Sequence, residues 1–168
     1  MEAARTATAD DLAAIVRLAS DVIDELEPTR GGAIWARHQA RDRPVAPSLA
    51  ATIDDPDALL VAGTIDDTIV GYAAVYLRRL RDGGLLAVLD DLYVEPEARG
   101  IGIGEAMMEQ VLDWARARGC VGVDSVALPG NRATKNFFES FGLVARAIVV
   151  HKSLTPDDPL AVPPVEDG

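Results

Sequence analysis

Near the N-terminus, apolar residues recur at helical spacing. From Leu12 to Leu26 they fall three or four positions apart and form one stripe, which predicts an amphipathic helix that ends before Pro28. Thr8, with Asp11 three residues further on, has the spacing of a capping box at the start of such a helix. The next stretch has less periodicity. The further elements expected before residue 55 are a short strand over 5–7 that precedes the long helix, a short helix over 34–41, a loop over 41–47 and a turn from Ser48 through Ile53.

In the middle of the chain the pattern changes to strands. Apolar, β-branched runs over 59–65 and 68–80 flank Asp66-Asp67 and predict an antiparallel hairpin with a tight turn. A second turn over 81–84 leads into a strand over 85–94, which completes a three-strand meander. The remaining elements expected are a helix over 104–118, a strand over 121–128, a helix over 133–141 and a last strand over 144–153.

Length and composition indicate one globular domain. The chain has 168 residues, of which 49% are hydrophobic, so a disordered chain is excluded. We expect a single domain over 1–154 and a flexible tail over 155–168, where four prolines and four acidic residues show little periodicity. No apolar stretch approaches the roughly 20 residues of a membrane span, and acidic residues interrupt the N-terminus where a signal peptide would be apolar. A cytoplasmic protein is therefore expected.

Charge and rare residues narrow the possible partners. The formal net charge of −11 disfavours a nucleic-acid partner and suits a cationic substrate. The single cysteine, Cys120, follows Gly119 at the end of a predicted helix and is expected to be a packing residue. His38 and His151 stand far apart without ligand spacing around them, so no metal site is expected. The basic residues are nearly all arginine, which is typical of a GC-rich bacterial genome.

A glycine-rich loop joins the strand that ends at Val94 to the next helix. Glycines at 100, 102 and 104 allow positive φ angles and close approach of a ligand, and the first-turn N–H groups of the helix favour an anion. A Walker loop is excluded because Gly-Lys-Ser/Thr is absent. A dinucleotide fingerprint would have G-x-G-x-x-G spacing, whereas the glycines here give G-x-G-x-G. Asp124 lies near the distance at which such a fingerprint has its acidic residue, so this alternative stays open. A glycine-rich turn that binds nothing is the third alternative.

Two segments together resemble a known family. The pattern Arg99-x-x-Gly102-x-Gly104, entered from Leu92-x-Val94-x-Pro96, resembles the acyl-CoA-binding motif of the GNAT superfamily of N-acetyltransferases. The segment 131–143 resembles the next strand-to-helix element of that family, and the resemblance is strongest over 90–143. It implies a GNAT-like α/β fold (α+β type): a central, mostly antiparallel mixed sheet of six to seven strands, flanked by about four helices, with a splay between the fourth and fifth strands.

The resemblance also implies acetyl-CoA as co-substrate. Asn131 has two interpretations, since it is well placed to cap a helix and the matching residue of the family commonly touches the coenzyme. The cofactor-binding residues implied are Leu92, Tyr93, Val94, Arg99, Gly100, Ile101, Gly102, Ile103, Gly104, Glu105, Asn131 and Phe138.

The expected catalytic residues are Asp90, Asp91 and Val94. The amide of Val94 would polarise the thioester carbonyl. One aspartate would take part in deprotonating the amine, and because neighbouring strand residues face opposite ways, only one of the two would face the pocket. Either aspartate has a structural alternative, as a turn cap or an ion pair with Arg78 or Arg79.

One position departs from the family pattern. Where the family often has a tyrosine that protonates the thiolate, this chain has Phe138, which has no proton to give. Tyr93, Ser125 and a bound water remain as possible donors.

The function expected is transfer of an acetyl group to a primary amine by direct attack in a ternary complex. A small cationic, polyamine-like acceptor is favoured, with Asp24 and Glu25 as substrate-binding residues beside the two aspartates. The alternatives are a non-catalytic acyl-CoA-binding or regulatory protein, motivated by Phe138, and acetylation of a peptide N-terminus or lysine. A homodimer is possible, and neither a nucleic-acid nor a membrane partner is expected.

Overall fold

The computed structural model describes residues 1–155, and the rest of the predicted tail lies outside the described residues. The chain divides into two compact units. The first combines Met1–Val22 with Asp42–Val126, and the second combines Ile23–Arg41 with the stretch from Ala127 onward. The elements in chain order are β1 (Glu2–Thr6), the 3₁₀ turn η1 (Ala9–Asp11), α1 (Leu12–Leu26), α2 (Gly32–His38), α3 (Ala46–Asp54), β2 (Ala58–Ile65), β3 (Thr68–Arg79), β4 (Leu85–Val94), η2 (Pro96–Ala98), α4 (Ile103–Ala117), β5 (Gly122–Ser125) and α5 (Arg132–Ser140).

The first unit is built on a five-stranded mixed sheet in the order β1-β2-β3-β4-β5. The first four strands pair antiparallel, and β4 pairs with β5 in parallel. Asp66 and Asp67 form the β2–β3 turn with φ angles of 46° and 68°, the backbone of a two-residue turn that continues the strand twist. The predicted hairpin, meander and mixed sheet are thus confirmed.

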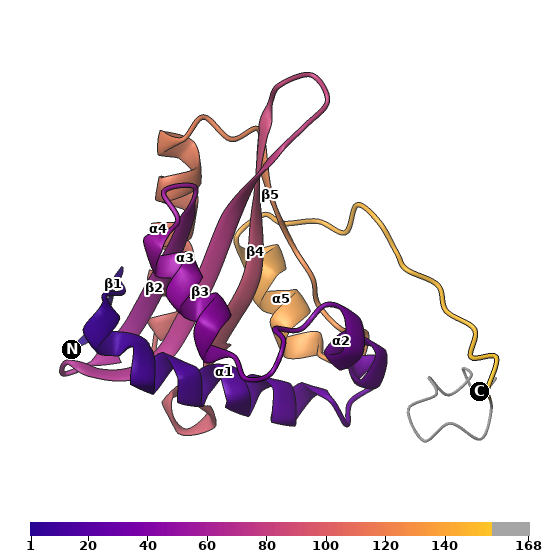
Figure 1. The fold of residues 1–168 in the computed structure, drawn as a ribbon, viewed down its shortest axis with the longest axis horizontal. Coiled ribbons are helices and arrows are strands. Elements are labelled where there is room, and N and C mark those ends of the chain that lie inside the picture. The colour runs from indigo at the N-terminus through magenta and orange to yellow at the C-terminus, as the bar shows by residue number, and fades with distance from the viewer. Residues whose placement is uncertain (156–168) are drawn as a thin grey trace. The chain divides into compact units, whose positions relative to one another are not determined.

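Helices cover both faces of this sheet. In Figure 1, α3 and the N-terminal part of α1 lie in front of the strands and α4 lies behind them. The apolar stripe of α1 buries Ile15 and Leu18, and α4 buries Met107, Met108 and Val111 against the sheet. The helical spacing of these residues is what places each stripe on one face.

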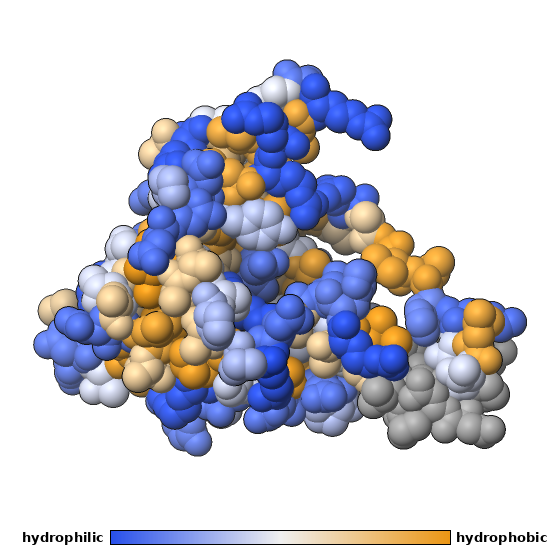
Figure 2. Space-filling view, in the orientation of Figure 1, coloured by the Kyte–Doolittle hydropathy of each residue, from blue (hydrophilic) through white to orange (hydrophobic). Residues whose placement is uncertain are grey.

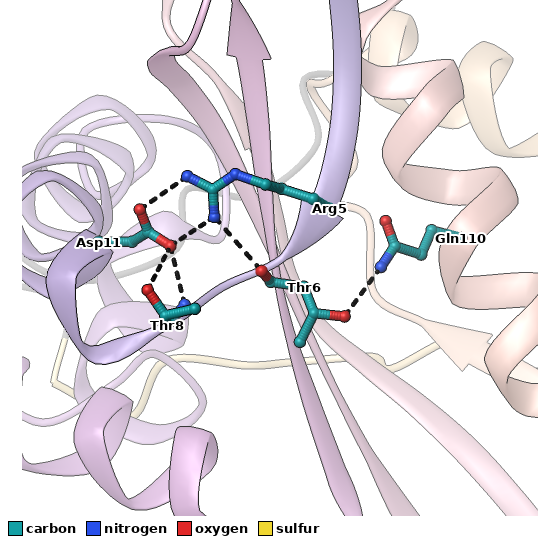
Figure 3. A network of polar contacts seen from close by, with 5 residues as sticks. All are labelled: Arg5, Thr6, Thr8, Asp11 and Gln110. Atoms are coloured by element: carbon teal, nitrogen blue, oxygen red, sulfur yellow. Dashed lines mark hydrogen bonds and ion pairs between the residues drawn. The ribbon is translucent and has the colours of Figure 1, made fainter.

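A polar network fixes the start of α1 to the first strand (Figure 3). The guanidinium of Arg5 donates two hydrogen bonds to the carboxylate of Asp11, at 2.6 and 2.8 Å. The backbone N–H of Thr8 donates to the same carboxylate at 2.8 Å, so the predicted capping box is confirmed. From α4, the Gln110 amide donates to the hydroxyl of Thr6 at 3.2 Å. The end of β1 is therefore held by η1, at the start of α1, and by α4.

The predicted strand count of six to seven is wrong for the part of the chain that the structure describes. The segment 144–153, expected as the last strand, follows α5 without forming a helix or a strand. Its β-branched residues satisfy strand propensity, but propensity measures how well side chains fit a pleated, half-buried surface. A strand propensity is therefore not enough by itself to assign a strand.

Candidate active site

Strand β4 continues beyond its partner β5. The parallel ladder runs from Leu86 opposite Gly122 to Leu89 opposite Ser125, and there it ends. The hydroxyl of Ser125 donates to the carbonyl of Leu89 at 3.0 Å and closes the ladder. The last five residues of β4 extend past this point, so the sheet opens between its fourth and fifth strands as predicted.

A β-bulge lies where the two strands separate. Val75 of β3 faces Leu89, and the next residue back, Ala74, faces Asp91, which leaves Asp90 as the extra residue of β4. Strict alternation is therefore interrupted at the two aspartates, and which of them faces the opening stays a prediction. Asp90 is exposed and Asp91 is half-buried.

The bulge also changes which backbone groups face the opening. Before it, the carbonyls of Leu85 and Leu89 accept hydrogen bonds from the β5 side. After it, the N–H of Glu95 donates to Val70 of β3 at 2.9 Å. Because backbone groups alternate along a strand, the N–H and C=O of Val94 point away from β3, toward the opening. An unbulged strand would turn the amide of Val94 toward β3.

The loop after β4 leads directly into the N-terminus of α4. Gly100 and Gly102 have φ angles of 82° and 99°, and a Cβ added at either would meet nothing within 4 Å. Both positions thus need glycine for conformation, and the space beside them is open. Gly102 is the N-cap residue and has no capping side chain, while the helical hydrogen bonds begin with the N–H of Ala106. The first-turn N–H groups of α4 therefore form a receptor for an anion.

Arg99 connects the loop to the end of the strand. Its Nε donates to the carbonyl of Val94 at 2.8 Å, and its guanidinium lies over the ring of Tyr93, 5.4 Å from the centroid. Tyr93 itself is buried. A fixed positive charge therefore stands beside the backbone that faces the opening.

Arg17 of α1 contacts the residue that directly follows β4. Its Nη1 lies 3.3 Å from the carboxylate of Glu95, the first residue after β4, and 3.4 Å from Asp21 one turn along the helix. This pair ties α1 to the beginning of the loop.

Two glycines that sequence reasoning missed hold α4 close to the sheet. Gly63 of β2 lies opposite Gly71 of β3. A Cβ at Gly63 would lie 2.7 Å from Cγ2 of Ile103 and 2.8 Å from Sδ of Met107, and one at Gly71 would lie 2.8 Å from the carbonyl oxygen of Tyr93. The pair forms a bare patch, here called the glycine notch, into which the first turns of α4 pack. An isolated glycine inside each of two strand patterns was the available signal.

Four of the predicted site residues belong to the second unit. Asp24 and Glu25 are exposed in the last turn of α1. Asn131 caps α5, its Oδ1 accepting the N–H of Thr134 at 3.1 Å, which confirms the capping interpretation. Phe138 is buried, with its ring centroid 5.8 Å from that of Phe137. Contacts of these residues with coenzyme or acceptor stay predictions.

The fold and the site define an α/β protein with a glycine-rich loop and a helix N-terminus at the opening of a mixed sheet. Residues 20–143 match the model of the acetyltransferase (GNAT) family. The chain therefore belongs to the GNAT family of acetyl-CoA-dependent acyltransferases, as its motifs predict.

Relatives and solved structures agree with this assignment. An aminoglycoside N(6′)-acetyltransferase type 1 of Klebsiella aerogenes is 33% identical over 49% of this chain and 56% of its own length. A thialysine N-epsilon-acetyltransferase of Bos taurus is 31% identical over 44% of this chain and 44% of its own length. The chain thus spans about half the length of the curated relatives it matches. The structure of AAC(6′)-Iy with a bisubstrate analogue, CoA-S-monomethyl-acetylneamine, has a TM-score of 0.70 at 16% identity, covering 91% of this chain and 97% of that one. At this identity the likeness concerns the fold alone.

Within residues 1–155, no helix combines the length and the apolar character that crossing a membrane requires.

Proposed function

We propose that this chain is an N-acetyltransferase that moves the acetyl group of acetyl-CoA to a primary amine by direct attack in a ternary complex. The observation that carries the proposal is the course of β4. The strand leaves β5 at Leu89 and runs straight into the glycine loop at the N-terminus of α4. A polarising amide and an anion receptor thereby stand at the same opening of the sheet.

Coenzyme A fits the donors present there. Its diphosphate matches the N–H groups of the loop and of the first turn of α4, where open space adjoins Gly100 and Gly102. Its amide-containing arm matches the exposed backbone edge of β4, which offers pairing as to an added strand. The residues proposed to hold it are Leu92, Tyr93, Val94, Arg99, Gly100, Ile101, Gly102, Ile103, Gly104, Glu105, Asn131 and Phe138.

The bound acetyl-CoA supplies a thioester, and the chain supplies the groups that activate the transfer. The N–H of Val94 donates to the carbonyl oxygen, where negative charge develops, a contribution of about 3 kcal/mol for a donor of this kind. The protonated amine first loses a proton to Asp90 or Asp91, directly or through water, which frees the lone pair that attacks. As the new C–N bond forms and the C–S bond breaks, the nitrogen loses its second proton and the departing thiolate takes one up.

The proton that the departing thiolate takes has fewer candidate sources than the sequence allowed. The hydroxyl of Ser125 already donates to Leu89, so its proton is engaged within the sheet. Phe138 offers none. Tyr93 and water remain as proton donors. The thiolate of a thiol with an ordinary pKa also leaves without help from an acid, at some cost in rate.

The proposed acceptor is a small cationic amine. Both curated relatives are named for transfer to an amine nitrogen, of an aminoglycoside and of thialysine. The net charge of −11 attracts such a molecule, and Asp24 and Glu25 add carboxylates at the end of α1. The proposed location is the cytoplasm of a bacterium, where a single thiol such as Cys120 stays reduced.

The first experiment is a calorimetric titration of acetyl-CoA into the protein and into Gly102→Glu. The new side chain forces an L residue into a positive φ angle and brings a carboxylate to the anion receptor, so affinity should fall at least 100-fold. Gly83→Glu is the matched control, since Gly83 also has a positive φ (86°) and open space but lies in the β3–β4 turn. Equal binding by the wild type and Gly102→Glu would refute the coenzyme site.

Turnover then separates the enzyme from a non-catalytic acyl-CoA-binding or regulatory protein. Release of free thiol is measured with polyamines, aminoglycosides and lysine-containing peptides as acceptors, in the wild type and in Phe138→Tyr. Turnover with small amines supports the proposal, and a preference for peptides shifts the acceptor class to a protein N-terminus or lysine. Tight acetyl-CoA binding without turnover in either protein would favour the non-catalytic alternative.

A further inference from the structure

A hollow lies between the C-terminal end of α4 and the sheet, within the first unit. Its volume is about 220 Å³, and five residues line it: Asp57, Leu77, Arg79, Leu85 and Arg118. Leu85 begins β4 and Val94 ends it, so this strand puts roughly 30 Å between the hollow and the glycine-rich loop. Figure 1 shows the β3–β4 turn and the end of α4 at the end of the sheet that lies away from that loop.

The register of the sheet brings the lining side chains together. Leu77 and Arg79 share the parity of Gly71 on β3, which packs against α4, so both point to the side of the sheet that this helix covers. Leu85 is the partner of Arg79 on β4 and lies on the same face. The N–H of Leu77 donates to the carbonyl of Asp57 at 3.0 Å. The two leucines therefore form an apolar wall beside three charged side chains.

Arg118 is fixed at one side of the hollow. Its Nη2 donates to the carbonyl of Pro56 at 2.7 Å, and its Nη1 lies 3.6 Å from a carboxylate oxygen of Asp57. The guanidinium carbon lies 5.0 Å from the centroid of the Trp114 ring. Three contacts thus set the position of Arg118, and Asp57 balances its charge.

Arg79 supplies the unbalanced charge of the hollow. Its guanidinium forms no ion pair or hydrogen bond with any residue from 1 to 155. The carboxylate of Asp82, in the β3–β4 turn, accepts the N–H of Gly84 at 2.9 Å. Two guanidiniums and one carboxylate give the lining a net charge of +1, in a chain whose net charge is −11. In Figure 2 hydrophilic residues gather over this turn, with hydrophobic residues between them.

We propose that the hollow binds a small carboxylate ion with an apolar body and a single negative charge. The carboxylate pairs with Arg79, because a guanidinium offers two parallel donors that match the two carboxylate oxygens. The apolar body lies against Leu77 and Leu85, where contact with a hydrocarbon removes their surface from water.

Size and charge both support this class of ligand. Pockets for drug-sized molecules have roughly 300–1,000 Å³, so a hollow of about 220 Å³ suits a smaller molecule. A lining of net charge +1 is neutralised by one negative charge, and the apolar wall favours a hydrocarbon over an inorganic anion. The inference does not depend on the acetyltransferase proposal, since the site lies at the other end of β4 and its test measures binding alone.

NMR titration of ¹⁵N-labelled protein tests the site with three probes. 4-Methylpentanoate has the charge and the apolar body, 4-methylpentanamide has the body alone, and acetate has the charge with almost no body. The first should bind saturably with a Kd on the order of 1 mM and shift the amide signals of residues 57, 77, 79, 85 and 118. The other two should bind at least 10-fold more weakly, because each lacks one of the two contacts.

Two neighbouring arginines provide a variant and its matched control. Arg79→Gln removes the unbalanced charge and should weaken binding of 4-methylpentanoate at least 10-fold. Arg78→Gln removes the same charge from the opposite face of β3, where Arg78 donates to the hydroxyl of Tyr76 at 3.0 Å, and should leave the affinity nearly unchanged. Both arginines are exposed, so neither change should alter the circular dichroism spectrum or the unfolding temperature.

Four results would overturn the inference. The first is that 4-methylpentanoate causes no saturable shift of those signals, and the second is that Arg79→Gln binds it as well as the wild type does. The third is tighter binding of inorganic phosphate at the same signals, which would assign the hollow to another class of anion. The fourth is a shift confined to residues 99–106, which would place the carboxylate at the N-terminus of α4 and leave the coenzyme proposal intact.

Discussion

Asp90 and Asp91 occupy the one place where β4 departs from regular geometry, and the proposed amine deprotonation depends on them. Changing the functional aspartate to asparagine keeps the shape of the side chain and removes the base. We therefore expect kcat/KM for the amine to fall on the order of 100-fold or more, with unchanged affinity for acetyl-CoA. Steady-state kinetics of Asp90→Asn and Asp91→Asn across pH measure this effect. Asp113→Asn, an exposed change on α4, is the charge control, and full activity of both site variants would remove the aspartates from the mechanism.

Asp11 shows how a single buried carboxylate contributes stability. The hydrogen bonds from Arg5 lower its pKa from 3.8 to about 2, and the Thr8 backbone N–H acts in the same direction. Because the folded-state pKa is the lower one, the contribution is complete above pH 4 and is lost as the pH falls toward 2. This lowering of the pKa corresponds to a contribution of about 2 kcal/mol to the free energy of unfolding.

Urea unfolding of Asp11→Asn should show this loss at pH 7, and the difference from the wild type should shrink as the pH is lowered toward 2. Asp10→Asn is the control, since the neighbouring Asp10 is exposed and forms no ion pair with any described residue. A difference between wild type and Asp11→Asn that stays constant from pH 7 to pH 2 would mean that the Arg5–Asp11 pair does not carry the effect.

At the scale of elements, the glycine notch sets the distance between α4 and the sheet. Gly63→Ala places a methyl group 2.7 Å from the Cγ2 methyl carbon of Ile103. Helix α4 must therefore move away from the sheet, or its side chains must adopt strained rotamers. Overpacking of this kind costs about 1–3 kcal/mol. Because the first turn of α4 is the proposed anion receptor, the KM for acetyl-CoA should rise more than the KM for the amine.

Thermal unfolding and kinetics of Gly63→Ala measure the two effects. Gly122→Ala is the matched control, another strand glycine whose added Cβ would lie 3.7 Å from Leu86 Cδ1, an ordinary contact. If the two substitutions change stability and the KM for acetyl-CoA equally, the notch has no special role in placing the helix.

The elements that local sequence determines are the ones that sequence reasoning found. The Asp66-Asp67 turn, the apolar stripe of α1 and the glycine N-cap of α4 depend on residues next to one another, so their patterns are legible in the chain. The bulge at Asp90 depends on the register between β3 and β4, and the glycine notch depends on where α4 packs. The bulge leaves no local signature, and for the notch the only local signal is an isolated glycine in each of two strand patterns. The segment 144–153 has a strand sequence, but a strand also needs a partner, which local sequence does not specify.

For the molecule as a whole, the net charge of −11 acts on the two proposed substrates with opposite signs. It attracts a cationic amine and repels the anionic acetyl-CoA, whose binding then depends on the local donors of the loop and on Arg99.

Raising the salt concentration from about 0.01 M to about 0.1 M shortens the screening length from roughly 30 Å to roughly 10 Å. The KM for a polyamine should therefore rise several-fold over this range, while the KM for acetyl-CoA should rise less or fall. A neutral hydroxylated monoamine, with one charge instead of several, should show a smaller rise than the polyamine. If both acceptors respond to salt equally, the overall charge of the protein does not select the acceptor, and recognition must come from groups that contact it directly.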